Sequence, residues 1–266
     1  MNLRYITCSD PREFNDIHDI VNLAQLSPRT EIAVQAHPSK MSVGMPRNQW
    51  FHELLNYVMT DKYNVNLAVH VNREWCEQIC ETGTFPQELK EMFDLCHDDK
   101  TGCPVIKRWQ LNMSRSAVKS IKYNKLKRLF QTNKDREFIL QYNENTRLAC
   151  GKLYDMGARF SLLYDASGGR GISPTVWTMP VFADRAQGYS GGMSPENVSE
   201  NLQKISTVAV KAVTKYDERN RRIYSLKERD DIWIDAEGKL KLDDKFNIER
   251  ARNYIINAEN WLNRHR

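Results

Sequence analysis

Cys8 and Asp165 carry the side chains of this sequence that are best placed to move protons. Cys8 directly follows the short apolar run Arg4–Thr7, and Asp165 directly follows the run Phe160–Tyr164. A thiolate whose pKa is lowered by nearby cations can act as a base, and a carboxyl group whose pKa is raised by partial burial can act as a general acid. Both residues are therefore predicted to be catalytic. The alternatives are a cysteine that is simply buried and an aspartate that satisfies a turn.

Glycines follow three of the apolar runs and predict a site for a phosphate group. Backbone N–H groups of glycine approach an anion closely, and a helix that begins nearby favours negative charge. Ser194-Pro195-Glu196-Asn197 reads as such a helix start. The predicted phosphate-binding residues are Gly168, Gly169, Gly191, Gly192 and Gly238. Asp235 and Glu237, beside Gly238, would repel a phosphate unless they point away or are paired.

The segments that position these residues alternate between short β-rich runs and amphipathic stretches, which predicts repeated βα units and a parallel sheet. The chain has 266 residues, close to the length of about 250 that is typical of an eight-stranded barrel. We therefore expect a single (β/α)8 TIM barrel over residues 1–266, with its site at the carboxyl ends of the strands. The expected strands are Arg4–Thr7, Glu31–Ala36, Asn66–Val71, Ile106–Leu111, Glu137–Gln141, Phe160–Tyr164, Gln187–Tyr189 and Asp231–Ile234.

Helical spacing of apolar residues predicts helices over Pro46–Met59 and Ser116–Phe130 and a last helix over Asn247–Arg264. Two segments do not fit the βα alternation and are predicted to be insertions. Thr84–Cys103 follows the third helix, and Tyr216–Asp230, with its basic run at positions 219–222, precedes the last strand.

Composition narrows the class of partner. The net charge of +5 suits an acidic small molecule such as a phosphate ester but is too small to indicate nucleic acid. The basic stretch Lys119–Arg128 has the spacing of a solvated outer helix. No run of about 18 apolar residues is present, so a membrane span is not expected. Six cysteines in a long chain without a signal stretch favour a reduced, cytoplasmic protein. We expect a monomer or homodimer. No motif indicates a cofactor.

Five short segments, in order along most of the chain, resemble those of the phosphoribosylanthranilate isomerase family. The strand-seven segment is the most specific, because Ser190 to Val198 is similar to the family's Ala-Gly-Gly-Leu-Asn-Pro-Glu-Asn-Val. The other four are Ile6-Thr7-Cys8, the run from Leu67 to Asn72, Trp109-Gln110-Leu111-Asn112, and Leu163-Tyr164-Asp165 with the following Gly168 to Gly171. The resemblance implies an Amadori rearrangement of a phosphorylated aminosugar, a step of tryptophan biosynthesis, with Cys8 as base and Asp165 as acid.

The sequence departs from the family at the substrate's carboxylate. The arginine that the family places four residues after a proline is Ser42 here, so Lys40 or Arg47 is the expected replacement, although lysine lacks the bidentate geometry of arginine. The family's strand-eight Ser-Ser-Gly is replaced by residues 235–238. The predicted substrate-binding residues are Lys40, Arg47, His70, Gln110, Asn112 and Arg170. His70 has a core position as its alternative.

Three other interpretations stay open. A barrel that only binds a phosphorylated small molecule or nucleotide would keep the glycines and lose turnover. A different phosphosugar isomerase or lyase would keep Cys8 and Asp165. The cluster Cys76, Cys80, Cys96, His97 and Cys103 could hold zinc, although structural zinc sites usually have more tightly paired ligands.

Overall fold

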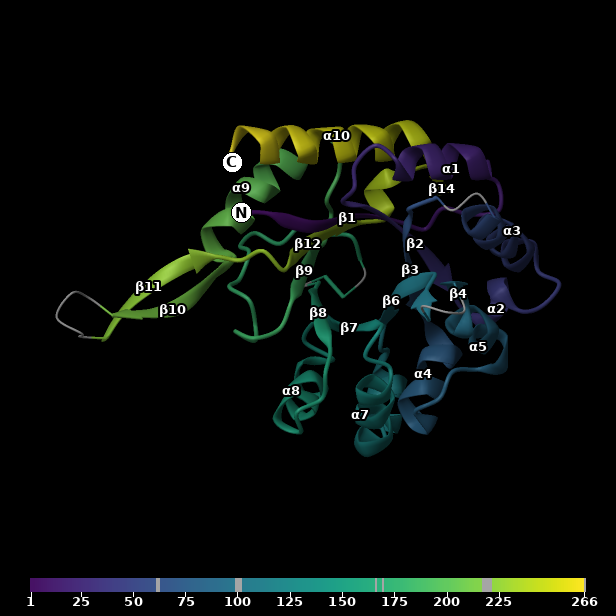
Figure 1. Cartoon of the computed structure of the whole chain (residues 1–266), viewed down its shortest axis with the longest axis horizontal. Helices are drawn as coiled ribbons and strands as arrows, with labels where there is room; N and C mark the ends of the chain where they lie inside the picture. The colour runs from purple at the N-terminus through teal and green to yellow at the C-terminus, as the bar shows by residue number, and fades with distance from the viewer. Residues whose placement is uncertain (61–62, 99–101, 166, 169, 217–221, 266) are drawn as a thin grey trace.

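The computed structural model describes the chain except residues 61–62, 99–101, 166, 169, 217–221 and 266. Eight parallel strands close into a barrel in the order β1-β12-β9-β8-β7-β6-β3-β2 (Figure 1). Each of the eight expected strands corresponds to one of them, so the predicted (β/α)8 TIM-barrel class is confirmed. The strands are β1 (Leu3–Ser9), β2 (Thr30–Ala36), β3 (Asn66–Val71), β6 (Ile106–Leu111), β7 (Glu137–Tyr142), β8 (Ser161–Tyr164), β9 (Gln187–Ser190) and β12 (Ile232–Ala236).

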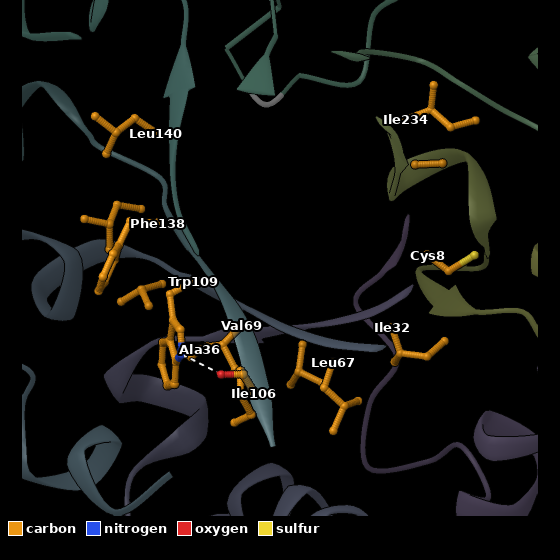
Figure 2. Close-up of a cluster of buried hydrophobic side chains, with 14 of the residues drawn as sticks. Cys8, Ile32, Ala36, Leu67, Val69, Ile106, Trp109, Phe138, Leu140 and Ile234 are labelled. Carbon is orange, nitrogen blue, oxygen red and sulfur yellow. Dashed lines mark hydrogen bonds between the residues drawn. The ribbon is translucent and has the colours of Figure 1, made fainter. Parts of the chain in front are cut away.

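The main apolar core lies between the barrel and its helices. Successive side chains of a strand point to opposite faces, so Ile32, Val34, Leu67 and Val69 belong to this outer layer and are fully or almost fully buried. Figure 2 shows Ile32, Leu67 and Val69 in this layer. A separate, smaller cluster of Ile139, Leu163 and Trp233 lies inside the barrel. The strands are buried on both faces, as expected of a parallel barrel.

Gly188 makes room for the largest side chain inside the barrel. A Cβ atom at position 188 would lie 2.2 Å from Cε2 of Trp233, so no larger residue fits there while the indole keeps its position. Trp233 is 1% exposed. Glycine on β9 is thus required by close packing, and it lets one aromatic ring fill the middle of the barrel.

An arginine below that ring is neutralised by two carboxylates. Arg108 Nη1 donates to Glu31 over 2.6 Å, and its Nε donates to Glu137 over 3.1 Å. The guanidinium group also lies 4.3 Å from the ring centre of Trp233 and 4.4 Å from that of Tyr5. A buried charge is tolerated only when it is paired and hydrogen-bonded, and the two carboxylates on β2 and β7 satisfy that condition for Arg108 on β6.

Helices surround the barrel (Figure 1). They are α1 (Ile17–Ala24), α2 (Pro38–Met41), α3 (Pro46–Thr60), α4 (Arg73–Thr82), α5 (Gln87–Asp94), α6 (Arg115–Ser120), α7 (Tyr123–Thr132), α8 (Arg147–Asp155), α9 (Val198–Val208) and α10 (Ile248–Arg264). The expected helices at Pro46–Met59 and Asn247–Arg264 are confirmed as α3 and α10. Asn247 caps α10, since its side chain accepts a hydrogen bond from the Arg250 N–H group.

The expected helix Ser116–Phe130 is wrong as one element, because the chain forms α6 and then α7 there. Ile121 leaves the helical region with ψ 120°. The N–H group of Lys122 donates to the carbonyl oxygen of Cys80 in α4 over 2.9 Å. A tertiary hydrogen bond and burial of Ile121 therefore outweigh the helical periodicity of the sequence.

Additional elements occur where insertions were expected. Between α4 and β6 the chain forms α5 and a small ribbon of β4 (Cys96–Asp98) and β5 (Cys103–Pro104). Between α9 and β12 it forms a hairpin of β10 (Val210–Tyr216) and β11 (Arg222–Glu228), which projects from the barrel (Figure 1). Positions 219–221 of the basic run lie outside the described residues. A shorter ribbon, β13 (Lys241–Leu242) with β14 (Lys245–Phe246), precedes α10.

Cys76 and Cys80 are buried in α4, whereas Cys96 and Cys103 lie on the β4–β5 ribbon. In the described part of the chain, no group of three or more His, Cys, Asp or Glu side chains is arranged to hold a metal ion. Nor does any described helix combine the length and apolar character needed to cross a membrane.

Candidate functional site

A cavity of about 470 Å³ opens at the carboxyl ends of the barrel strands. We call it the mouth cavity. Most of the residues that sequence reasoning selected line it. These are His70, Gln110, Asn112, Asp165, Gly168, Arg170, Gly191, Gly192 and Gly238. Gly169 lies outside the described residues. The structure therefore brings together one predicted catalytic residue and most of the predicted binding residues.

Asp165 lies directly after β8 and is 4% exposed. Its Oδ2 accepts a 2.8 Å hydrogen bond from Gln141 Nε2. Its Oδ1 accepts from the hydroxyl group and the N–H group of Ser167, over 2.7 Å and 3.1 Å. Donors on both oxygens fix the orientation of the carboxyl group at the cavity wall. The carboxylate of Asp165 is therefore a hydrogen-bond acceptor whose position is fixed by Gln141 and Ser167.

Asp235 is a second carboxyl group in the same cavity, and the sequence analysis treated it only as a neighbour of the predicted phosphate site. It lies on β12, which is separated from β8 by the single strand β9. Burial raises the pKa of Asp235 to about 8, and the charges of Glu237 and Glu31 add to this effect. A hydrogen bond of 2.6 Å from Ser9 Oγ opposes it. Asp235 is therefore largely protonated at neutral pH.

His70 lies on the wall opposite these carboxyl groups and is 3% exposed. Burial, and then the charge of Arg108, lower the pKa of His70 to about 3. The ring is consequently neutral at physiological pH, with one nitrogen donating and one accepting. Its Nδ1 lies 3.5 Å from Gln35 Nε2. A neutral imidazole can bind a hydroxyl group without attracting an anion.

Four amide side chains form a continuous hydrogen-bonded chain along the ends of β2, β3 and β6. Gln110 Nε2 donates to Asn112, and Asn112 Nδ2 donates to Asn72 over 2.9 Å. Asn72 in turn donates to Gln35, whose Nε2 donates to Glu237 over 2.9 Å. Amides offer both donors and acceptors, so this row, which we call the amide chain, suits the hydroxyl groups of a sugar.

Gly191 and Gly192 form a turn that only glycine accommodates well. Their φ angles are 119° and 60°, in the region that side chains disfavour. A Cβ atom on Gly192 would lie 2.6 Å from the backbone nitrogen of Ser173 and 2.9 Å from the carbonyl oxygen of Gly171. The loop between β8 and β9 thus packs directly on the turn, and glycines of both segments line the mouth cavity.

Two cations lie near these glycines. Arg170 and Lys239 both line the mouth cavity, and both are exposed. Space is open around Gly238, since a Cβ atom there would meet nothing within 4 Å. An anion at this edge would find backbone N–H groups together with positive charge.

The helix start expected at Ser194 is wrong by one turn. Helix α9 begins at Val198, with Asn197 as its N-cap. Asn197 Oδ1 accepts from the Ser194 N–H group over 2.8 Å, and its Nδ2 donates to the Gly192 carbonyl oxygen over 2.9 Å. Residues 194–197 therefore form a separate turn before the helix. The side chain of Asn197, and not the end of a helix, holds the glycine turn in place.

Cys8 does not point into the barrel mouth, which corrects the expectation that it is a catalytic base there. It is 0% exposed, belongs to the outer apolar layer near Ile32 (Figure 2), and does not line the mouth cavity. The inward residues of β1 are the ones beside it, because Thr7 Oγ1 donates to Glu31 and Ser9 Oγ donates to Asp235. Burial, followed by the charges of Asp235 and Glu31, raises the pKa of the Cys8 thiol. The thiol is therefore neither exposed nor ionised.

Lys40 and Arg47 do not line the mouth cavity either. Lys40 is exposed in the short helix α2. Arg47 is 4% exposed and is held by Glu13 over 3.0 Å and by Asp10 over 3.5 Å. Its guanidinium group is already neutralised, and it lines a neighbouring cavity. Neither residue replaces the family's arginine in the mouth cavity.

One signal in the sequence could have found the missed residues. Gln35, His70 and Gln110 are register partners on β2, β3 and β6, and each is a polar residue near the end of an apolar strand. In a barrel such residues point inward at the same level. Applying the same alternation to β12 selects Asp235.

The fold and the mouth cavity together define a (β/α)8 barrel with a polar site at the carboxyl ends of its strands. No protein-family model matches the chain, and no curated protein does. Among solved structures, the phosphoribosylanthranilate isomerase of Thermotoga maritima aligns at 11% identity with a TM-score of 0.47, over 97% of this chain and 99% of that one. The Pyrococcus furiosus isomerase aligns at 9% and 0.47, over 96% and 98%. The 3-hexulose-6-phosphate synthase of Salmonella typhimurium aligns at 10% and 0.44, over 97% and 99%.

Proposed function

We propose that the chain is an isomerase that converts a phosphorylated aldose or aminoaldose to the corresponding ketose by acid–base catalysis. The observation that carries this proposal is a pair of buried carboxyl groups, Asp165 and Asp235, in the wall of one cavity. They differ in environment, because burial raises the pKa of Asp235, whereas Asp165 accepts hydrogen bonds on both of its oxygens. Two carboxyl groups in unlike environments can divide the acid and base roles.

The two carboxyl groups take different roles. Asp235 is the acid, because its raised pKa of about 8 leaves a proton to donate at neutral pH. Asp165 is the base, because Gln141 and Ser167 donate to both of its oxygens and leave it as an acceptor. This assignment reverses the role that the sequence suggested for Asp165 and replaces Cys8 with an inward-facing residue.

In the proposed reaction, Asp235 gives its proton to the ring oxygen, and the C–O bond of the ring breaks as the protonated C1 imine or carbonyl forms. Asp165 then removes the proton from C2, which yields the enol or enolamine. Asp165 returns a proton to C1, and Asp235 takes the proton of the C2 hydroxyl group as the C2 carbonyl forms. Both carboxyl groups end as they began, and one hydrogen has moved from C2 to C1.

The remaining groups of the cavity hold the substrate. The phosphate is assigned to the edge formed by Gly191, Gly192 and Gly238, with Arg170 and Lys239 beside it, because barrel phosphate sites commonly use the loops after the last two strands. The amide chain and the neutral ring of His70 are assigned to the sugar hydroxyl groups. Binding energy at the phosphate then positions C1 and C2 between the carboxyl groups.

Proton NMR in deuterium oxide tests the chemistry directly. Pentose 5-phosphates, hexose 6-phosphates and their N-aryl amines would be incubated with the protein, and deuterium at C1 or C2 would be followed. We expect ketose formation with deuterium incorporation, and a rate lower by about 10²-fold or more in Asp165→Asn and in Asp235→Asn. Asp19→Asn, an exposed carboxylate on α1, is the control and should match the wild type.

Two results would overturn the proposal. Absence of exchange with every phosphorylated aldose would remove the isomerase, and calorimetric binding of the same compounds would then favour the barrel that only binds them. Unchanged exchange in both carboxyl variants would remove the assigned acid and base even if turnover were present.

A further inference from the structure

A second cavity, of about 360 Å³, adjoins the mouth cavity above the ends of β2 and β3. We call it the side cavity. The two cavities have five lining residues in common: Gln35, Asn72, Asn112, Ser114 and Glu237. Three of these belong to the amide chain. A molecule that lies along the amide chain therefore extends from one cavity to the other.

Two residues that line the side cavity have backbone conformations that are rare for residues other than glycine. Among the described residues, four other than glycine have a positive φ, and two of them, Asp243 and Asp244, form the tight turn between β13 and β14. The other two, Asp10 at 74° and Arg73 at 54°, both line the side cavity. Such conformations cost energy and cluster at functional sites.

Three cations surround one carboxylate in this cavity. Arg12 Nε donates to Asp10 over 2.9 Å, Lys241 Nζ lies 2.7 Å from it, and Arg47 lies 3.5 Å away. Burial alone would raise the pKa of Asp10, but hydrogen bonds from Arg12 and Lys241 hold it below its usual value. Asp10 therefore stays ionised and fixes Arg12 and Arg47 at the cavity wall, while Lys241 lies outside the lining.

Arg73 is different from these cations. It is exposed, it lines the side cavity, and within the described part of the chain no carboxylate forms an ion pair with it. It is the first residue of α4, where an arginine is not needed to satisfy the helix dipole. Nearby, burial and then the charges of Arg73 and Arg47 lower the pKa of His37, so its ring is neutral. A positive side chain on a strained backbone is thus left without a carboxylate partner among the described residues.

We propose that Arg73, assisted by Arg12 and His37, binds a second anionic group of the substrate in the side cavity. The inference rests on the proposed function, because it places the sugar along the amide chain and the first phosphate beside Gly191 and Gly192. The substrate then carries a negative group at each end, and the shared chemistry is that of a phosphate or a carboxylate held by a guanidinium group.

Calorimetry with three inert probes tests this inference. The probes are a pentitol 5-phosphate, a pentonate 5-phosphate, which adds a carboxylate, and a pentitol 1,5-bisphosphate. We expect at least one of the two doubly charged probes to bind the wild type about tenfold or more tightly than the monophosphate. The probe with the larger gain identifies the second group as carboxylate or phosphate.

Arg73→Gln should abolish that gain and leave the Kd of the monophosphate unchanged. Arg73→Gly should do the same while relieving the backbone strain, so it guards against misfolding of the first variant. Lys40→Gln removes a nearby exposed positive charge that lines neither cavity, and it should keep the full gain. This control separates a specific contact from a general effect of charge.

Equal affinity of the wild type for all three probes would overturn the inference, and so would a gain that survives both Arg73 variants. These outcomes are independent of turnover. Isomerisation without a gain would defeat the side-cavity assignment alone, whereas a gain without isomerisation would defeat the proposed function alone.

Discussion

The hydroxyl group of Ser9 on β1 donates a hydrogen bond of 2.6 Å to Asp235 on β12, the neighbouring strand. This bond lowers the pKa of Asp235 and so opposes the rise caused by burial. Ser9→Ala should therefore raise the pKa of Asp235 further above about 8. Because the proposed acid must be protonated, the alkaline limb of kcat/KM should move to higher pH. A profile measured between about pH 6 and 10 checks this, and an unmoved limb contradicts it.

Asp235 should also give stability a characteristic pH dependence. Its pKa is about 8 in the folded chain and about 3.9 in an unfolded one. The folded state binds the proton more tightly, so stability decreases as pH rises through this window, by at most about 1.4 kcal/mol per pH unit. Asp235→Asn lacks this dependence. Urea unfolding at several pH values should show that the free energy of unfolding of the variant increases relative to that of the wild type as pH rises between these limits. The same pH dependence in both proteins would contradict the prediction.

Cys8→Ser should leave turnover almost unchanged. The thiol lies in the outer apolar layer and does not line the mouth cavity. The variant buries a hydroxyl group in apolar surroundings, so we expect a loss of about 1–3 kcal/mol in stability. Steady-state kinetics and thermal unfolding measure the two effects. A fall in kcat of more than about tenfold, with folding intact, would restore Cys8 as a candidate base.

Gly192→Ala should damage both stability and anion binding. The φ angle of 60° disfavours a side chain, and the new Cβ atom would meet the Ser173 nitrogen at 2.6 Å. We expect a loss of about 1–3 kcal/mol in stability and weaker binding of inorganic phosphate. Gly151→Ala is a matched control, because that glycine lies in α8 with nothing within 4 Å of its Cβ position. Equal effects of the two substitutions would contradict the assigned packing of the loop on the turn.

Arg108→Leu should destabilise the barrel strongly. The substitution leaves the buried carboxylate of Glu31 and the partly buried carboxylate of Glu137 without their central partner. Removing one member of a buried ion pair typically costs about 3–5 kcal/mol. Arg4→Leu removes a second partner of Glu137 whose side chain is 40% exposed, and it should cost about 1 kcal/mol or less. Denaturant unfolding of both variants measures the contrast.

The architecture could be predicted from the sequence because strands buried on both faces appear as short apolar runs, such as Ile32-Ala33-Val34. The break at Ile121 could not, since it depends on a hydrogen bond to Cys80, which lies far away in the sequence. Local periodicity carries no information on such contacts.

The candidate site could be predicted only in part. Polar residues at strand ends, such as His70 and Asp165, were found because the fold requires them to converge. Cys8 was placed wrongly because a shift of one residue along a strand moves a side chain to the other face, and the motif did not fix that register. Asp235 was judged only as a neighbour of phosphate, since its burial, and hence its raised pKa, depends on the packed barrel.

The plug of Ile139, Leu163 and Trp233 has a kinetic consequence. Leu163 forms part of the floor of the mouth cavity, while Glu137 and Ser161, one step further down the same strands, line a different cavity at the opposite end. The mouth cavity is therefore closed at its base and does not connect to the cavity at the other end of the barrel. In the proposed isomerisation, substrate and product would use the same opening in turn, so we expect accumulated ketose to exclude fresh aldose and to act as a competitive inhibitor.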